Sequence, residues 1–178
     1  MSRIITQDQV HLLRVRGVWT VRCYDSRGRL KWTDESENLV VNVGLTYLIG
    51  VALLTTTQIA LSSWFTGITA TAPTVAAADT MASHGGWTEN QTYSQATRPA
   101  WSGVAGAAGA ASNTASPSVF SANGSSTAGG VFLNSVSTKG GTTGTLFSAV
   151  AFTGGDRTLL SGDTLNVTYN LSVIDDGV

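Results

Sequence analysis

Bulky and polar residues alternate over residues 18–24, with the period of two that is typical of a β-strand. The Asp-Ser-Arg-Gly sequence at residues 25–28 has turn chemistry, because its glycine is free to adopt a positive φ. Residues 29–33 then return as a second strand. The pattern predicts a β-hairpin in which Trp19, Val21 and Cys23 share one face, while Leu30 and Trp32 face neighbours across the pair.

Apolar side chains recur at helical spacing over residues 43–54, which predicts the only helix of the chain. Asn42 stands just before this segment, where its side chain can cap the helix. The segment contains two glycines and no charged residue, so we expect the helix to be packed on most of its sides. The side chains at helical spacing are Val43, Tyr47, Val51 and Leu54.

The rest of the chain has the pattern of strands, turns and loops. Residues 34–37 form a short acidic break, and residues 38–41 read as another strand or as an extended entry into the helix. Residues 59–68 predict a strand with a bulge at Gly67. Residues 71–86 read as a loop, and the low-complexity, Gly- and Ala-rich residues 102–118 suit close approach to another backbone.

Four further strands are predicted, separated by turns that contain glycine; they cover residues 118–122, 128–137, 145–153 and 163–174. Several short strands at such spacing favour an antiparallel architecture over a parallel α/β sheet. We therefore predict a mainly β fold, a jelly-roll or β-sandwich with one short helix and an N-terminal arm.

Basic residues are concentrated at the start of the chain, where seven of the ten lie within the first 31 positions. This asymmetry divides the 178 residues into a basic N-terminal arm at residues 1–17 and a β-rich structural domain at residues 18–178. The net charge of −1 argues against a general nucleic-acid binder. The arm could dock on an acidic partner surface or remain a solvated tail.

Charged residues make up only 12% of the chain, about half the usual share, and Ser and Thr make up about a quarter. Such a surface suits a body largely covered by neighbouring subunits, but an uncharged β-surface exposed to water fits equally well. The longest apolar run spans about 12 residues, whereas a membrane span needs about 20. With no targeting signal visible, we expect a soluble protein without membrane contact.

The search for chemistry finds no catalytic or metal-binding constellation. The two histidines, His11 and His84, have no partners at ligand spacing, and Ser83, His84 and Asp79 are merely adjacent in sequence. Cys23, the single cysteine, cannot form an internal disulfide and reads as a buried, inert thiol. Asp34, like its acidic neighbours, reads as part of an exposed turn. We therefore expect no enzyme activity, no metal and no cofactor.

The aromatic residues Trp64, Phe65, Trp87, Tyr93 and Trp101 allow two interpretations. If they are exposed, they could stack on sugars or anchor a protein partner; if they are buried, they form the core. A carbohydrate-binding module would use Trp87 and Trp101 as its stacking platform. The partner-binding candidates that the sequence offers are Arg3, Arg14, Arg16, Trp87, Arg98 and Trp101.

Three stretches of the chain carry a resemblance to a known class of proteins: residues 37–45 (ENLVVNVGL), residues 78–89 (ADTMASHGGWTE) and residues 161–169 (SGDTLNVTY). The motifs at residues 71–74 (TAPT), 96–101 (ATRPAW) and 130–133 (GVFL) extend it. Together they resemble small structural proteins of tailed bacteriophages over roughly residues 17–172.

This resemblance implies a virion component of the capsid decoration or cement type. Such a subunit would be made in the cytoplasm of the bacterial host and lie on the capsid exterior. Its partners would be the major capsid protein and copies of itself, as a symmetric dimer or trimer, without direct contact to nucleic acid. The alternative is a tail, fibre or head–tail component of the same particle, and the copy number per particle separates the two.

Overall fold

The computed structural model describes residues 13–175. Strands account for 42% and helix for 9% of the structure, so the prediction of a mainly β fold with one short helix is confirmed. In chain order the elements are β1 (Leu13–Tyr24), β2 (Leu30–Glu37), β3 (Leu39–Val40), α1 (Asn42–Leu53), the 3₁₀ segment η2 (Leu61–Ser63), β4 (Phe65–Thr69), β5 (Val104–Ala105), β6 (Ala110–Ser112), β7 (Ser118–Ser121), β8 (Ser126–Ala128), β9 (Gly130–Asn134), β10 (Leu146–Ala151), β11 (Arg157–Leu159) and β12 (Thr164–Asp175).

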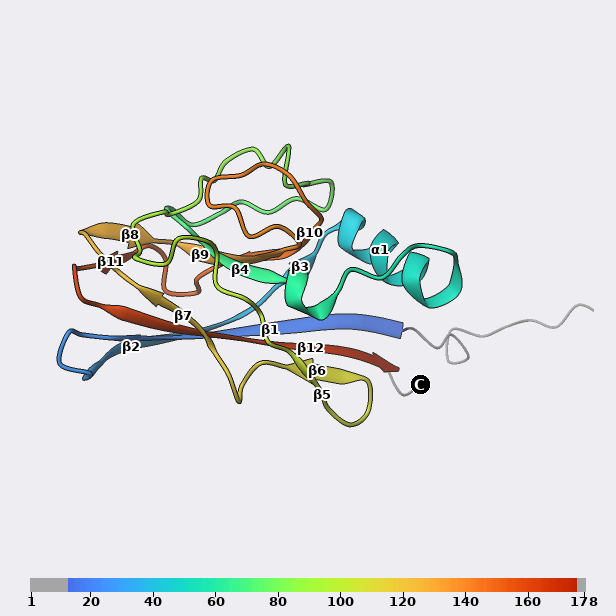
Figure 1. Ribbon diagram of the computed structural model, residues 1–178, viewed down its shortest axis with the longest axis horizontal. Coiled ribbons are helices and arrows are strands. Elements are labelled where there is room, and N and C mark those ends of the chain that lie inside the picture. The colour runs from blue at the N-terminus through green and yellow to red at the C-terminus, as the bar shows by residue number, and fades with distance from the viewer. Residues whose placement is uncertain (1–12, 176–178) are drawn as a thin grey trace, which may run out of the picture.

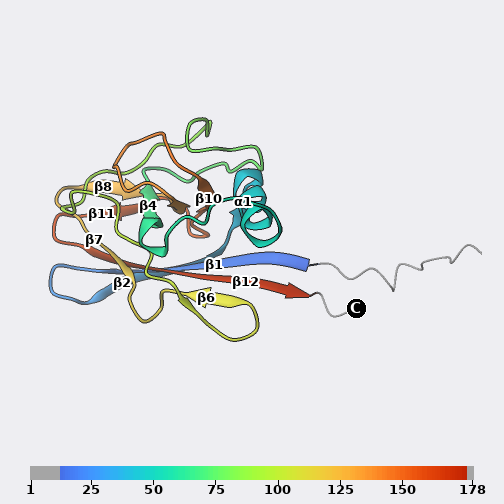
Figure 2. The ribbon, with the colours of Figure 1, turned by 45° about the vertical axis from the view of Figure 1, so that its right-hand side comes forward.

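The strands form two larger antiparallel sheets and one small pair. The first sheet has the order β2-β1-β12-β6-β5, with β7 also paired to β12, and the second has the order β3-β10-β9-β4. The small pair joins β11 to β8. The sheets lie in two layers, and α1 sits at the end of the molecule where β1 begins (Figures 1 and 2).

The antiparallel pair of β1 and β12 runs the full length of the first sheet. All twelve residues of β1 pair with β12, from Leu13 opposite Asp175 to Tyr24 opposite Thr164. The predicted hairpin of β1 and β2 is present, and Trp19 and Val21 are 1% exposed. The strand begins five residues before its predicted start, so Arg14 and Arg16, which the charge pattern assigns to the N-terminal arm, lie in β1.

The predicted acidic break at residues 34–37 is wrong, because β2 continues through it to Glu37. Asp34 and Ser36 alternate inward at 4% exposure each. The Asp34 carboxylate accepts hydrogen bonds from the backbone N–H groups of Thr153 (3.0 Å) and Gly154 (2.9 Å) and from the Ser36 hydroxyl (2.8 Å). These donors satisfy the buried charge, which explains how an acidic residue occupies an inward strand position.

The strand predicted over residues 59–68 is present only in the C-terminal part of that segment. Residues 61–63 form the 3₁₀ segment η2, and β4 begins at Phe65. The register of β4 with β9 is regular, so Gly67 does not mark a bulge. Gly67 instead lies directly under the ring of Phe132, in the space that a Cβ would fill.

The four later strands are confirmed as β7, β9, β10 and β12. The Gly- and Ala-rich residues 102–118 contain two short strands, β5 and β6, that the pattern did not predict. The segment approaches another backbone closely, as predicted, because a Cβ on Gly109 would lie 2.7 Å from the carbonyl oxygen of Val173 in β12.

The main hydrophobic core lies between the two sheets. It joins side chains of the first sheet, such as Trp19 and Leu165, to side chains of the second, such as Val131 and Phe147. Trp64, Trp87, Tyr93 and Trp101 are all buried, so of the two interpretations of the aromatic set the core is correct for these four.

Candidate functional site: an apolar surface on helix α1

Helix α1 turns its glycines towards the protein, and Leu45, Ile49 and Leu53 towards water. Gly44 and Gly50 are its buried residues. A Cβ on Gly44 would lie 2.5 Å from the carbonyl oxygen of Phe147 in β10, so only glycine allows the helix to lie this close to the sheet. The prediction that α1 is packed on most sides is therefore wrong, and a large part of it faces solvent.

The helix begins at Asn42 itself, and the preceding Val41 makes no side-chain capping bond, so the predicted cap is also absent. Asn42 instead donates its backbone N–H to the carbonyl oxygen of Ala77 at 2.8 Å. On the inner side, Tyr47 and Leu48 pack against the core, and the Tyr47 hydroxyl accepts the backbone N–H of Ile59 at 2.8 Å. These contacts fix which face of the helix is exposed.

The exposed face carries a row of large aliphatic side chains four residues apart. Leu45 is 38% exposed, Ile49 55% and Leu53 76%. Two further leucines are exposed nearby: Leu54, just after the helix, is 69% exposed, and Leu61 in η2 is 55% exposed. We call these five residues the α1 surface. A monomeric soluble protein exposes isolated apolar side chains freely, but a row of them along one helix face makes that face a candidate interaction site.

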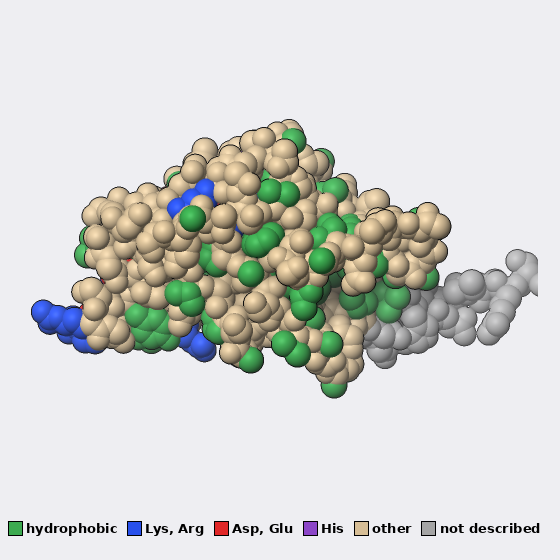
Figure 3. Space-filling view, viewed as in Figure 1, with side chains coloured by type: hydrophobic (Ala, Val, Ile, Leu, Met, Phe, Trp, Pro, Cys, Tyr) green, Lys and Arg blue, Asp and Glu red, His purple; other side chains and the backbone are tan. Residues whose placement is uncertain are grey.

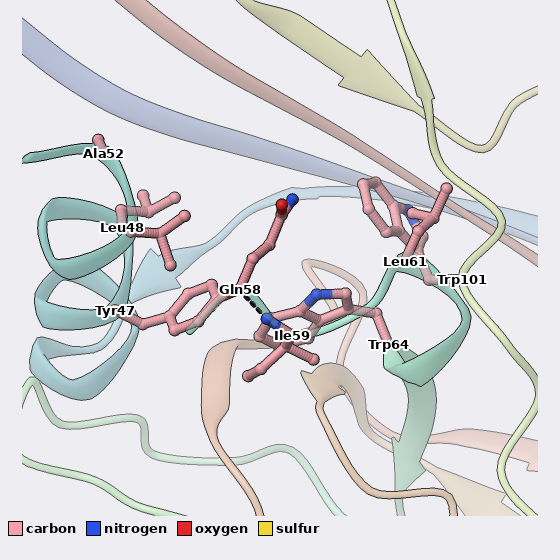
Figure 4. Close-up of a pocket in the computed structure, with 9 residues that line it drawn as sticks. Tyr47, Leu48, Ala52, Gln58, Ile59, Leu61, Trp64 and Trp101 are labelled. Carbon is pink, nitrogen blue, oxygen red and sulfur yellow. Dashed lines mark hydrogen bonds between the residues drawn. The ribbon is translucent and has the colours of Figure 1, made fainter. Parts of the chain in front are cut away.

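A hollow of about 320 Å³ adjoins the α1 surface. Figure 4 shows Tyr47 and Leu48 on its helix side and Leu61 and Trp101 on the opposite side. A second hollow of about 580 Å³ shares Leu61 and Trp101 and continues to Val104 in β5, which is 63% exposed. The two hollows therefore run from α1 past η2 to the edge strand β5, and Leu61 is the residue of the α1 surface that lines both of them.

Among residues 13–175, no charged side chain belongs to α1 or lines either hollow. Basic side chains appear at only a few places on the face in Figure 3. Without charges or clustered polar groups, this surface lacks the precisely placed polar contacts that orient a small ligand. What it can offer a partner is the removal of apolar area from water.

Arg98, a partner-binding candidate, is instead part of a buried ion pair. Its side chain and that of Glu89 are 0% and 4% exposed, with Nη2 and Oε2 2.8 Å apart. Arg98 also donates to the carbonyl oxygens of Val136 (2.8 Å) and Gly141 (2.9 Å). The network ties the segment before β5 to the connection between β9 and β10, so Arg98 stabilises the fold and presents no surface to a partner.

Trp87 and Trp101 are also in the interior, at 4% and 7% exposure. His84 stacks on Trp87 at 3.8 Å between ring centroids, and the ring of Phe132 lies 5.1 Å from Trp87. Trp101 donates its indole N–H to the carbonyl oxygen of Tyr169 at 3.4 Å. With so little of either side chain exposed, Trp87 and Trp101 do not form the open stacking platform of a carbohydrate-binding module.

The basic candidates lie apart from this interior group. Arg14 and Arg16 are exposed on β1, and Arg16 forms an ion pair with Glu37 of β2. Arg3 lies outside the described residues. Contact of these three arginines with a partner stays a prediction.

The residues considered as catalytic or metal-binding candidates make contacts that stabilise the fold. Burial, followed by the nearby Asp163 carboxylate, raises the pKa of the Cys23 thiol to about 11, which keeps it protonated. The Asp79 carboxylate accepts the backbone N–H of Ala76 at 3.0 Å. Within residues 13–175, no three side chains of His, Cys, Asp or Glu gather as metal ligands would. No helix in that part of the chain has the length and apolar character of a membrane span.

The α1 surface was missed from the sequence, although a signal for it exists. Leu45, Ile49 and Leu53 are spaced by four residues, as a helical face requires. The same segment has a second apolar face at Val43, Tyr47 and Val51, and a helix that is apolar all round reads as buried. The pattern could not tell which of the two faces lies against the sheet.

No family model, curated protein or solved structure matches this chain.

Proposed function

We propose that this chain is a structural subunit of a tailed-phage virion, one that decorates and cements the capsid by contacts between protein subunits. The observation that carries the proposal is the α1 surface, an uncharged apolar face that remains exposed on an otherwise well-packed β body. The resemblance of residues 17–172 to phage structural proteins supplies the setting, and the low content of charged residues suits a body surrounded by neighbours.

The architecture that we propose is a β-sandwich. In support, the larger sheets lie in two layers and their inward side chains form a common core. Such a body is a rigid platform, because each sheet holds the other through the interdigitated side chains. A rigid body with one exposed apolar face suits attachment to a capsid lattice.

Attachment through the α1 surface would be driven by the hydrophobic effect. Its five side chains leave the equivalent of roughly three whole leucine side chains in water. Burying one such side chain contributes about 1.5–3 kcal/mol, against a cost of about 4–15 kcal/mol for immobilising the subunit. One contact is therefore modest, and stable decoration comes from several contacts made at once.

A cryo-EM map of the intact particle tests this proposal. We expect the subunit on the capsid exterior in many copies, with α1 in a contact between protein chains. Few copies at the tail or at the head–tail junction would support the alternative virion role, and absence from the particle would overturn both.

The role of the N-terminal segment is tested by its deletion. Removal of residues 2–12 leaves β1 and its pairing with β12 intact, whereas a deletion to Arg16 would remove four residues of that strand. We expect the shorter deletion to lower the occupancy of purified particles. Unchanged occupancy would remove the arm from the attachment.

A further inference from the structure

We infer that Asn123 is a site of spontaneous deamidation, at which the folded protein converts a side-chain amide into a carboxylate. Asn123 and Gly124 form the only Asn-Gly pair of the chain. They lie in the connection between β7 and β8, at the end of the molecule away from α1 (Figures 1 and 2). The inference concerns the chemistry of this connection and does not depend on the proposed function.

The reaction joins the side chain of Asn123 to the backbone that follows it. The backbone nitrogen of Gly124 loses its proton and attacks Cγ of Asn123, so that a C–N bond forms and the side-chain nitrogen leaves as ammonia. Water then opens the five-membered imide at either of its carbonyl groups, which gives aspartate or isoaspartate. One water molecule is consumed and one molecule of ammonia is released, and no oxidant or reductant takes part.

Gly124 favours this attack in two ways. It has no Cβ, so its nitrogen can approach Cγ of the preceding residue without the steric hindrance that any other residue would impose. Among residues 13–175, no backbone carbonyl oxygen accepts a hydrogen bond from its N–H group. No such bond therefore has to break before the nitrogen loses its proton.

The position of Asn123 leaves its side chain free to turn. Asn123 is exposed to water, whereas the backbone on either side of the connection is held. Ala122 donates its N–H to the carbonyl oxygen of Asp163 at 2.8 Å, and β8, which pairs with β11, begins at Ser126. Residues 123–125 between these points belong to no strand, so the regular backbone of a sheet does not keep the reacting atoms apart.

The other asparagines are less suited to the reaction. Each of the other seven is followed by a residue with a side chain, which hinders the attack. Three are also buried, with amide groups that donate to backbone carbonyl oxygens: Asn90, Asn113 and Asn134. Asn113 is held at both ends of its amide, because Nδ2 donates to Val167 at 3.2 Å and Oδ1 accepts the N–H of Tyr169 at 2.7 Å. The structure therefore singles out Asn123.

Incubation of the full-length protein in mildly alkaline buffer, followed by peptide mass spectrometry, tests the inference. We expect the peptide that contains Asn123 to gain, with time, the mass difference between an amide and a carboxyl group. The new carboxylate changes the net charge of the chain from −1 to −2, which ion-exchange chromatography resolves. The peptides that contain Asn90 and Asn113 should stay unchanged while the protein is folded. A synthetic peptide of residues 118–128, kept in the same buffer, gives the rate without the fold.

Gly124→Ala is the matched variant. The φ of Gly124 is not in the left-handed region, and an added Cβ would meet only the methyl group of Thr92, at 3.0 Å, so the fold should persist, which far-UV circular dichroism checks. We expect the variant to react at least roughly tenfold more slowly, because its Cβ hinders the attack. An unchanged Asn123 in the folded protein after the synthetic peptide has reacted would overturn the inference. Equal conversion of Asn113, or a Gly124→Ala variant that reacts as fast as the wild type, would overturn it as well.

Discussion

Replacing Arg98 with alanine should separate a structural role of this residue from a role in partner binding. The guanidinium group is fully buried and donates to Glu89 through two nitrogens, at 3.0 Å from Nε and 2.8 Å from Nη2. Alanine removes the only arginine of this network and leaves the Glu89 carboxylate buried without its counter-charge. It also leaves the carbonyl oxygens of Val136 and Gly141 without a donor that each has in the wild type.

The size of the effect follows from this burial. Removing one partner of a buried ion pair costs about 3–5 kcal/mol, because the remaining charge has lost its compensation. For a chain of this length, each kcal/mol lowers the melting temperature by about 2–4 °C, so a fall of roughly 6–20 °C is expected. Arg98→Lys keeps the charge but not the planar two-pronged donor, and it should lose a smaller part of the stability.

Urea unfolding measures the loss of unfolding free energy. The protein concentration is kept fixed, because any association between chains depends on concentration and changes the apparent stability. The double variant Glu89→Gln with Arg98→Met provides the control, since removing both charges should restore part of the stability lost by Arg98→Ala. A free energy of unfolding of Arg98→Ala within about 1 kcal/mol of the wild type would refute the reasoning.

Three other predictions concern the interior. Burial alone would raise the pKa of the Asp34 carboxyl, but the hydrogen bonds that it accepts lower this pKa, so the wild type should lose stability as the pH falls through the lowered value. Asp34→Asn should be less stable than the wild type by about 1.5–3 kcal/mol at neutral pH and should depend less on acid. Urea unfolding at several pH values measures both effects. Gly67→Ala places a methyl group into the Phe132 ring and should cost about 1–3 kcal/mol; a thermal melt equal to that of the wild type would contradict it. Cys23, which is 0% exposed and has a raised pKa, should react with a thiol reagent at neutral pH only when the protein unfolds, and rapid labelling of the native chain would be evidence against its burial.

The sequence predicts the strands well where side chains alternate strictly. Trp19, Val21 and Cys23 lie on one inward face as expected, and the long β12 follows its predicted range closely. The pattern fails where a local signal is outweighed by tertiary contacts. Asp34 reads as an exposed turn residue, yet backbone N–H groups from the connection after β10 make it a buried strand residue.

The candidate site is less predictable than the fold. Trp87, Arg98 and Trp101 are residue types that are common in binding sites, but the same types form well-packed interiors, and composition does not separate these cases. The location of α1 depends on the contact of Gly44 with the backbone of Phe147, about a hundred residues further along the chain. No local pattern contains that contact, so the exposed face of α1 becomes visible only in the structure.

The central claim is that the chain is a virion subunit held by its apolar α1 surface. The most direct test is the binding of purified protein to particles that lack it. Co-sedimentation of the wild type, Ile49→Glu and Leu160→Glu with such particles compares a change in the surface with a matched change elsewhere. Leu160 is 51% exposed, close to the 55% of Ile49, and lies before the start of β12. We predict that the wild type and Leu160→Glu saturate the particles and that Ile49→Glu does not bind. Equal binding of Ile49→Glu and the wild type would contradict the role of the α1 surface, and no binding by the wild type would contradict the virion role itself.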